Sequence, residues 1–231
     1  MSEFSGFPKA AVKFYKDLSK NNTKEWFEAH RDDFENHVME PSRQFVTAMG
    51  RRLREIAPRV VADPRVNQSI FKIHRDIRFS KDKTPFKTNV AFLWWEGKFK
   101  KLENSSFYFH LEPSFLLIGL GIYQFPKPHL EAFRESVENG KHGAELAKAI
   151  ETVRSNGYEV SGQNFKKVPH GFSVDHPHAD LLRYDGLTVG LESKIPDELY
   201  SPALVDFCFE HYKKMLPIHQ WLVAMTERMP D

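Results

Sequence analysis

Three apolar runs separated by short polar connections constrain this fold more than any other feature of the sequence. They cover residues 86–95, 107–111 and 115–123, and bulky apolar side chains recur at alternate positions in each. Alternation with a period of two residues is typical of a half-buried β-strand. Because consecutive strands joined by short connections usually lie beside each other, the three runs predict an antiparallel meander.

Helical patterns flank this predicted sheet on both sides. Apolar residues recur at helical spacing before and after the meander, with proline or asparagine at several of the expected starts. Helices are predicted over residues 8–20, 22–38, 41–57, 130–140, 146–157, 202–216 and 218–229. One further strand is predicted over 187–192. Helices first, a central antiparallel meander next and helices last indicate an α+β protein, and the length fits one domain over residues 1–231.

The composition narrows the class of protein further. Of the 231 residues, 41% are hydrophobic and 28% charged, which is typical of a globular chain. Cys208 is the single cysteine, so no intrachain disulfide can form. It is expected to lie on the buried side of its helix, in the protein core. The sequence shows no signal peptide and no membrane-spanning run, so we expect a cytoplasmic protein without a membrane partner. No feature indicates an oligomeric state.

A densely charged segment precedes the predicted meander. Phe71, Ile73, Ile77 and Phe79 alternate with charged residues, which predicts a first long strand over residues 69–79. Arg75 breaks the pattern, because it falls on the side that faces the core. A charge in that position is costly unless it is paired or lies at a ligand cleft, so we expect a buried carboxylate partner or a site.

The charged segment predicts a site for a small anion. Arginine binds phosphate or carboxylate through its forked guanidinium, and lysine adds a point charge. The predicted ligand-binding residues are Arg75, Arg78, Lys83 and Lys87. If the polar faces of neighbouring strands are shared, three further side chains supply acid–base capacity. The predicted catalytic residues are His74, Tyr108 and His110.

Two alternatives stand beside this hypothesis. In one, the charged segment is a structural network of ion pairs. In the other, the chain is a nucleic-acid or protein interaction module, and its basic residues are Arg51, Arg52, Arg54, Lys98, Lys100 and Lys101. A net charge of +2, from 33 basic and 31 acidic residues, argues against strong non-specific nucleic-acid binding but leaves a local interface open.

The sequence contains no recognised metal-binding or cofactor-binding motif. The pairs His74/Asp76, His110/Glu112 and His176/His178 lack the spacing of a recognised zinc motif, so no metal site is predicted. Gly119 and Gly121 lie inside a predicted strand rather than before a helix, which argues against a dinucleotide fingerprint and favours close packing or a bulge. No motif identifies a cofactor.

Five segments of the chain carry a family resemblance: residues 21–27, 75–87, 119–123 followed by Leu130 and Arg134, 167–172 and 175–183. Together they resemble domain of unknown function 2461, a family of conserved hypothetical proteins of bacteria and fungi. The resemblance covers nearly the whole chain and implies a single cytoplasmic domain with motifs spread along it. It carries no catalytic residue, cofactor or substrate.

Overall fold

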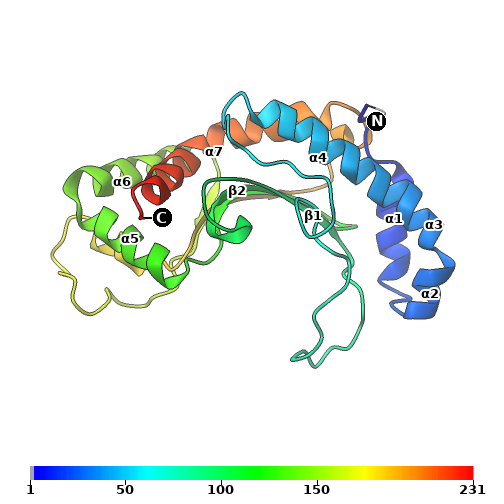
Figure 1. Cartoon of the computed structure of the whole chain (residues 1–231), viewed down its shortest axis with the longest axis horizontal. Helices are drawn as coiled ribbons and strands as arrows, with labels where there is room; N and C mark the ends of the chain where they lie inside the picture. The colour runs from blue at the N-terminus through cyan, green and yellow to red at the C-terminus, as the bar shows by residue number, and fades with distance from the viewer. Residues whose placement is uncertain (1–2, 231) are drawn as a thin grey trace. The chain divides into compact units, whose positions relative to one another are not determined.

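A computed structural model describes residues 3–230 and confirms the α+β class (Figure 1). The helices are α1 (Lys9–Leu18), α2 (Lys24–Ala29), α3 (Arg31–Phe34), α4 (Glu40–Leu53), α5 (Lys127–Glu138), α6 (Gly140–Ser155) and α7 (Leu204–Glu227). A π-helical turn η1 (Glu35–Met39) joins α3 to α4, and the 3₁₀ turns are η2 (Lys101–Glu103), η3 (Ala179–Arg183) and η4 (Asp197–Tyr200). The strands are β1 (Val90–Glu96), β2 (Ser105–Leu111), β3 (Leu116–Ile122), β4 (Glu159–Ser161) and β5 (Leu187–Ser193).

The strands within the described residues form one sheet in the order β1-β2-β3-β5-β4. The predicted meander is confirmed as β1, β2 and β3, and the predicted strand over 187–192 as β5. Strand β4, absent from the sequence prediction, pairs antiparallel with β5 through Val160 and Val189.

The chain divides into two compact units. The first unit contains the residues up to Trp94 together with Tyr108–Ile118 and Glu192–Glu210. The second contains Trp95–Phe107, Gly119–Leu191 and the residues from His211 onward.

An aromatic cluster forms the core of the first unit. The rings of Phe7 and Phe45 lie 5.7 Å apart, and those of Phe92 and Phe109 lie 5.4 Å apart, all of them buried. Such pairs contribute about 0.5–1.5 kcal/mol each beyond their buried area. The indole N–H of Trp94 donates to the Val46 carbonyl over 3.0 Å, which attaches β1 to α4. This core gives the charged segment a rigid support.

The predicted strand over residues 69–79 is wrong. Only isolated bridges form there, which join Ile70 to Val66 and Phe92 and His74 to Phe86, and Phe79 is 94% exposed. In Figure 1 this part of the chain follows α4 as a long loop before β1. Aspartate side chains bond to nearby backbone N–H groups and guanidinium groups, and such local hydrogen bonds compete with a strand ladder.

Two details of the predicted helices also differ. The helices expected over 202–216 and 218–229 are one helix, α7, with Pro217 inside it. A proline removes one intrahelical hydrogen bond, but buried residues on both sides, including Met215 and Ile218, favour a continuous helix. The N-cap of α2 is Thr23 and not Asn22, since the Thr23 hydroxyl accepts from the Trp26 N–H.

Cys208 is fully buried in α7 as expected, and burial raises the pKa of its thiol.

Candidate functional site

Asn22 attaches the charged loop to the N-terminal helices of the first unit. Its side-chain amide donates to the Phe86 carbonyl over 2.9 Å, and its side-chain oxygen accepts from the Phe86 N–H over 3.1 Å. The Phe86 ring stacks on Phe27 with the ring centroids 4.3 Å apart. Asn22 therefore bonds to both backbone groups of one residue, as a neighbouring strand would. Sequence reasoning missed this role, because nothing local links residues 22 and 86.

We expect Asn22→Ala to destabilise the protein by roughly 2–4 kcal/mol, because it leaves both backbone groups of the buried Phe86 without this partner. Asn21→Ala is the matched control, since the Asn21 side chain is exposed and bonds only to the Asp17 carbonyl within the described residues. Urea unfolding followed by circular dichroism measures both variants. Equal stability of the two variants would show that Asn22 does not hold the loop.

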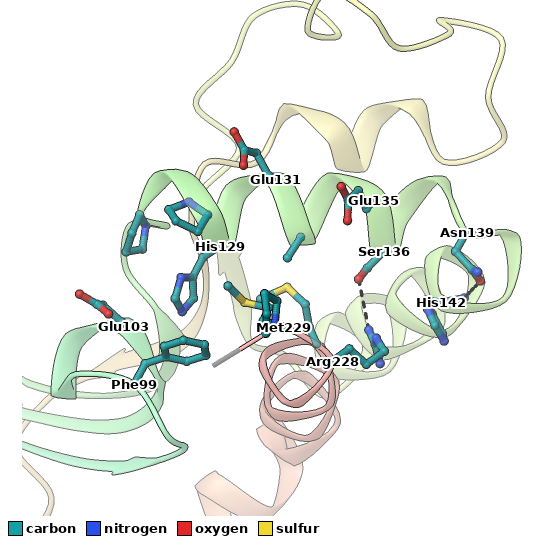
Figure 2. Close-up of a pocket in the computed structure, with 15 residues that line it drawn as sticks. Phe99, Glu103, His129, Glu131, Glu135, Ser136, Asn139, His142, Arg228 and Met229 are labelled. Atoms are coloured by element: carbon teal, nitrogen blue, oxygen red, sulfur yellow. Dashed lines mark hydrogen bonds between the residues drawn. The ribbon is translucent and has the colours of Figure 1, made fainter.

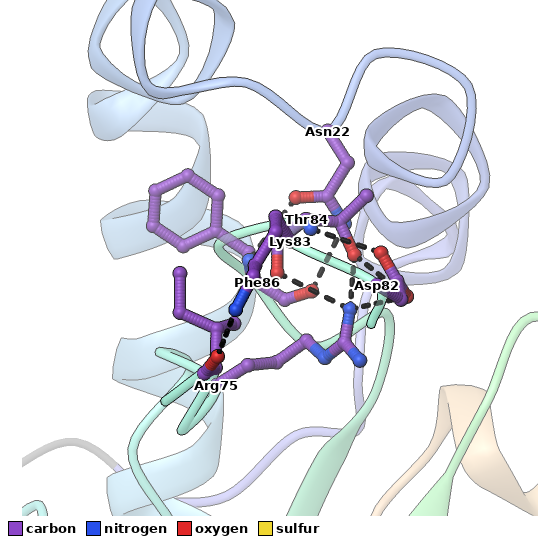
Figure 3. Close-up of polar contacts among 7 residues, drawn as sticks. Asn22, Arg75, Asp82, Lys83, Thr84 and Phe86 are labelled. Carbon is purple, nitrogen blue, oxygen red and sulfur yellow. Dashed lines mark hydrogen bonds and ion pairs between the residues drawn. The ribbon is translucent and has the colours of Figure 1, made fainter. Parts of the chain in front are cut away.

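Arg75 closes the charged loop on itself (Figure 3). Its Nη1 donates to the Asp82 carboxylate over 2.5 Å, to the Thr84 carbonyl over 3.2 Å and to the Thr84 hydroxyl. The N–H of Thr84 and the Arg75 guanidinium lower the pKa of Asp82. The prediction of a buried carboxylate partner for Arg75 is wrong, because the Asp82 side chain is 59% exposed and that of Arg75 is 26% exposed. The inward position of Arg75 was inferred from a strand that does not form.

Arg78 and Lys83 make local contacts elsewhere on the loop. Arg78, 77% exposed, pairs with Asp76 over 2.7 Å, and its hydrogen bond lowers the pKa of that carboxyl to about 2. The Lys83 ammonium donates to the Ile77 carbonyl over 2.9 Å. Neither side chain lines a cavity with Arg75. The structure thus divides the four predicted ligand-binding residues instead of gathering them.

Arg75 and Lys87 do line one cleft, which we call the Lys87 cleft. Its volume is about 450 Å³. The lining residues are Ser19, Asn22, Arg75, Asp82, Thr84, Phe86, Lys87, Thr88 and Asn89. Its surface is rich in hydroxyl, amide and basic groups, which are the usual donors to phosphate and carboxylate oxygens.

Lys87 is the unusual residue of this cleft. The side chain is half-buried, and its ammonium lies 5.5 Å from the centre of the Phe71 ring. Burial, together with the nearby Lys72, lowers the pKa of Lys87. Within residues 3–230 no carboxylate forms an ion pair with it. A partly desolvated cation without an anionic partner favours the binding of an anion.

The predicted catalytic residues lie outside the Lys87 cleft. The Tyr108 hydroxyl is 3.0 Å from His110 Nδ1, and His110 Nε2 is 3.2 Å from a Glu112 carboxylate oxygen. Burial raises the pKa of Tyr108 to about 12, and the Phe71 ring contacts both Tyr108 and Lys87. His74 is separate, with its ring beside Phe86.

The basic residues of the alternative interaction module are partly engaged within each unit. In the first unit, Arg52 pairs with Glu55 over 2.5 Å and with Asp206 over 3.1 Å, and its guanidinium lies 4.1 Å from the centre of the Phe209 ring. In the second unit, Lys98 donates to the Met229 carbonyl over 2.8 Å. The two carboxylates offset the charge of Arg52, whereas the carbonyl bonded to Lys98 leaves the charge of that lysine in place.

Within residues 3–230, no group of three or more His, Cys, Asp or Glu side chains is placed to hold a metal ion. No helix in the same range is both long enough and apolar enough to cross a bilayer.

Comparison with known proteins gives a family without an assigned activity. No match was found among curated proteins. A family model described as conserved hypothetical protein (DUF2461) matches residues 10–221, which is most of the chain. The resemblance of the sequence motifs is thereby confirmed, and the chain belongs to the DUF2461 family.

Proposed function

We propose that the Lys87 cleft binds a small ligand that carries a phosphate or carboxylate group. The observation that supports the proposal most directly is the half-buried ammonium of Lys87, which has no carboxylate partner within the described residues. Asp82 lies in the same cleft, but its charge is balanced by Arg75. The charge of Lys87 is therefore left for a ligand.

Neighbouring groups complete the proposed anion site. Arg75 uses only Nη1 for its hydrogen bonds within the described residues, so Nε and Nη2 remain as donors. Thr88 and Asn89 contribute a hydroxyl and an amide at the cleft wall. The proposal covers binding alone, because Tyr108 and His110 are not among the residues that line the cleft. The contributions of Arg78 and Lys83 to binding, expected from the sequence, are not part of it.

Lys87→Met is expected to weaken the binding of an anion by about 10–100-fold, because a hydrogen bond to a charged group contributes roughly 1.5–3 kcal/mol. The probes are inorganic pyrophosphate and citrate, measured by isothermal titration calorimetry at low ionic strength. Lys83→Met removes the same charge from the same loop but outside the cleft, so it should bind as the wild type does. Absence of binding to the wild type, or equal weakening by both variants, would refute the site.

Lys87→Met should also leave the protein at least as stable as the wild type at pH 7. The pKa of Lys87 is below its ordinary value of 10.5 in the folded state, so the unfolded chain binds more protons between those two values. The wild type therefore gains stability as pH rises through that window, and the variant loses this gain. Since Lys87 is only half-buried, the difference is roughly 0–1 kcal/mol. Urea unfolding at pH 7 and 9.5 measures it, and marked destabilisation would indicate a structural lysine.

A further inference from the structure

The second unit contains a larger cavity, of about 800 Å³, between α5, the C-terminal end of α7 and the η2 turn (Figure 2). Its apolar lining includes Phe99, Pro126, Pro128, Ala132, Met225 and Met229. This volume falls within the range of about 300–1,000 Å³ that is typical of small-molecule sites. Rings and flexible thioethers suit the apolar body of a small ligand, because methionine adapts its shape and contacts aromatic groups favourably.

His129 lines this cavity and lacks a hydrogen-bond partner. It lies in the first turn of α5 and is only 2% exposed. Neither ring nitrogen makes a hydrogen bond of acceptable geometry within the described residues, although the backbone of Glu103 is close. The Phe99 ring packs edge-on with its centroid 4.7 Å from that of the imidazole. A buried polar group without a partner costs roughly 1–3 kcal/mol, so this histidine calls for an explanation.

The chemistry of His129 leaves an acceptor available. Burial lowers the pKa of the imidazole, while the Glu103 carboxylate acts in the opposite direction. A neutral imidazole has one N–H donor and one nitrogen with a free lone pair. Its position beside Glu103 therefore places a neutral acceptor and a carboxylate at the same part of the cavity.

The charges that line the cavity favour a cation. Its carboxylates are Glu103, Glu131 and Glu135, and the only guanidinium among its lining residues is that of Arg228. Arg228 donates to the Ser136 hydroxyl over 3.2 Å, as the dashed line in Figure 2 shows. Glu103 is half-buried, and within residues 3–230 its carboxylate has no ion-pair partner. Glu131 and Glu135 are exposed, and Glu131 lies 4.0 Å from Lys127, so Glu103 is the partly desolvated carboxylate that favours a positively charged ligand.

We propose that this cavity binds a small organic amine with an apolar body. The ammonium group donates a hydrogen bond to the imidazole of His129 and pairs with the Glu103 carboxylate. The apolar body packs against Phe99, Met225 and Met229. The site is independent of the Lys87 cleft and prefers ligands of the opposite charge.

The test compares probes of similar size and different charge on the full chain. Phenethylamine and isoamylamine are the amines, and phenylpropionate is the anion. The expected result is that at least one amine binds in isothermal titration calorimetry and raises the melting temperature, while phenylpropionate binds at least tenfold more weakly. Absence of binding by both amines, or equal binding of phenylpropionate, overturns the proposal.

Variants of the wall of the cavity locate the binding. Glu103→Gln is expected to weaken the amine by about tenfold or more, since it removes a charge-assisted hydrogen bond. Glu138→Gln, at an exposed glutamate at the end of α5 that does not line the cavity, should have no effect. His129→Leu should also weaken the amine, and it should fold because it removes an unpartnered polar group. Unchanged amine binding by Glu103→Gln overturns the proposal even if His129→Leu does not fold.

Discussion

His219→Ala is expected to lower the free energy of unfolding by about 3–5 kcal/mol, because it removes one member of a buried hydrogen-bonded network that includes a carboxylate. His219 is 1% exposed, and its Nε2 lies 2.9 Å from a carboxylate oxygen of Glu96. Its Nδ1 lies 2.8 Å from the Ser105 hydroxyl. The alanine variant deprives the buried Glu96 carboxylate of its imidazole partner and opens a cavity beside the Phe107 ring, 4.5 Å away.

The measurement is urea unfolding at pH 7, with His37→Ala as the control. His37 is 42% exposed and lies 3.8 Å from Asp33, so its loss should change the stability by less than about 0.5 kcal/mol. A His219→Ala variant that unfolds within about 1 kcal/mol of the wild type would show that the network contributes little to stability.

The order serine, histidine, carboxylate in this network matches that of a nucleophilic triad. Burial argues for a structural role instead. A nucleophile must reach its substrate, and Ser105 is 0% exposed between the strands and α7. The stability measurement on His219→Ala therefore tests the structural role of this network.

The fold class could be predicted because it depends on local patterns. Alternating apolar residues and short connections fixed β1, β2 and β3 as neighbours, and helical spacing placed α1 and α4. The arrangement of β5 between β3 and β4 could not be predicted, because it depends on pairing between strands that are far apart in the sequence. Strand β4 has three residues, too few for its alternation to be recognised.

The sequence predicted which segment holds the candidate residues, but it did not predict how those residues are arranged. The charge density of residues 70–88 pointed to the loop that lines the Lys87 cleft, and Arg75 and Lys87 do share that cleft. Positions within the loop were inferred from a strand period, which assigned Arg75 to the core and placed Arg78 with the ligand. In the structure, local hydrogen bonds decide both positions. His129 and its cavity carry no sequence signal, because the elements that enclose them meet only through tertiary packing.

Gly121→Ala is expected to destabilise the protein by roughly 2–6 kcal/mol, through a strained backbone and a clash between strands. Gly121 has φ of +130°, a region that side chains other than glycine rarely adopt. A Cβ atom there would overlap the Leu187 carbonyl oxygen and lie 2.8 Å from the Thr188 Cα on β5. Both obstacles are backbone atoms, so no side-chain rotation can relieve the contact.

Gly140→Ala is the matched control for this prediction. Gly140 begins α6, has nothing within 4 Å of a built Cβ atom and no positive φ, so alanine should be neutral or stabilise by about 0.4–1 kcal/mol. Urea unfolding of both variants measures the difference. Equal stability would mean that β3 does not approach β5 closely at Gly121. A large loss for Gly121→Ala alone would establish that this glycine serves strand packing, as expected for a Gly-x-Gly pattern inside a strand.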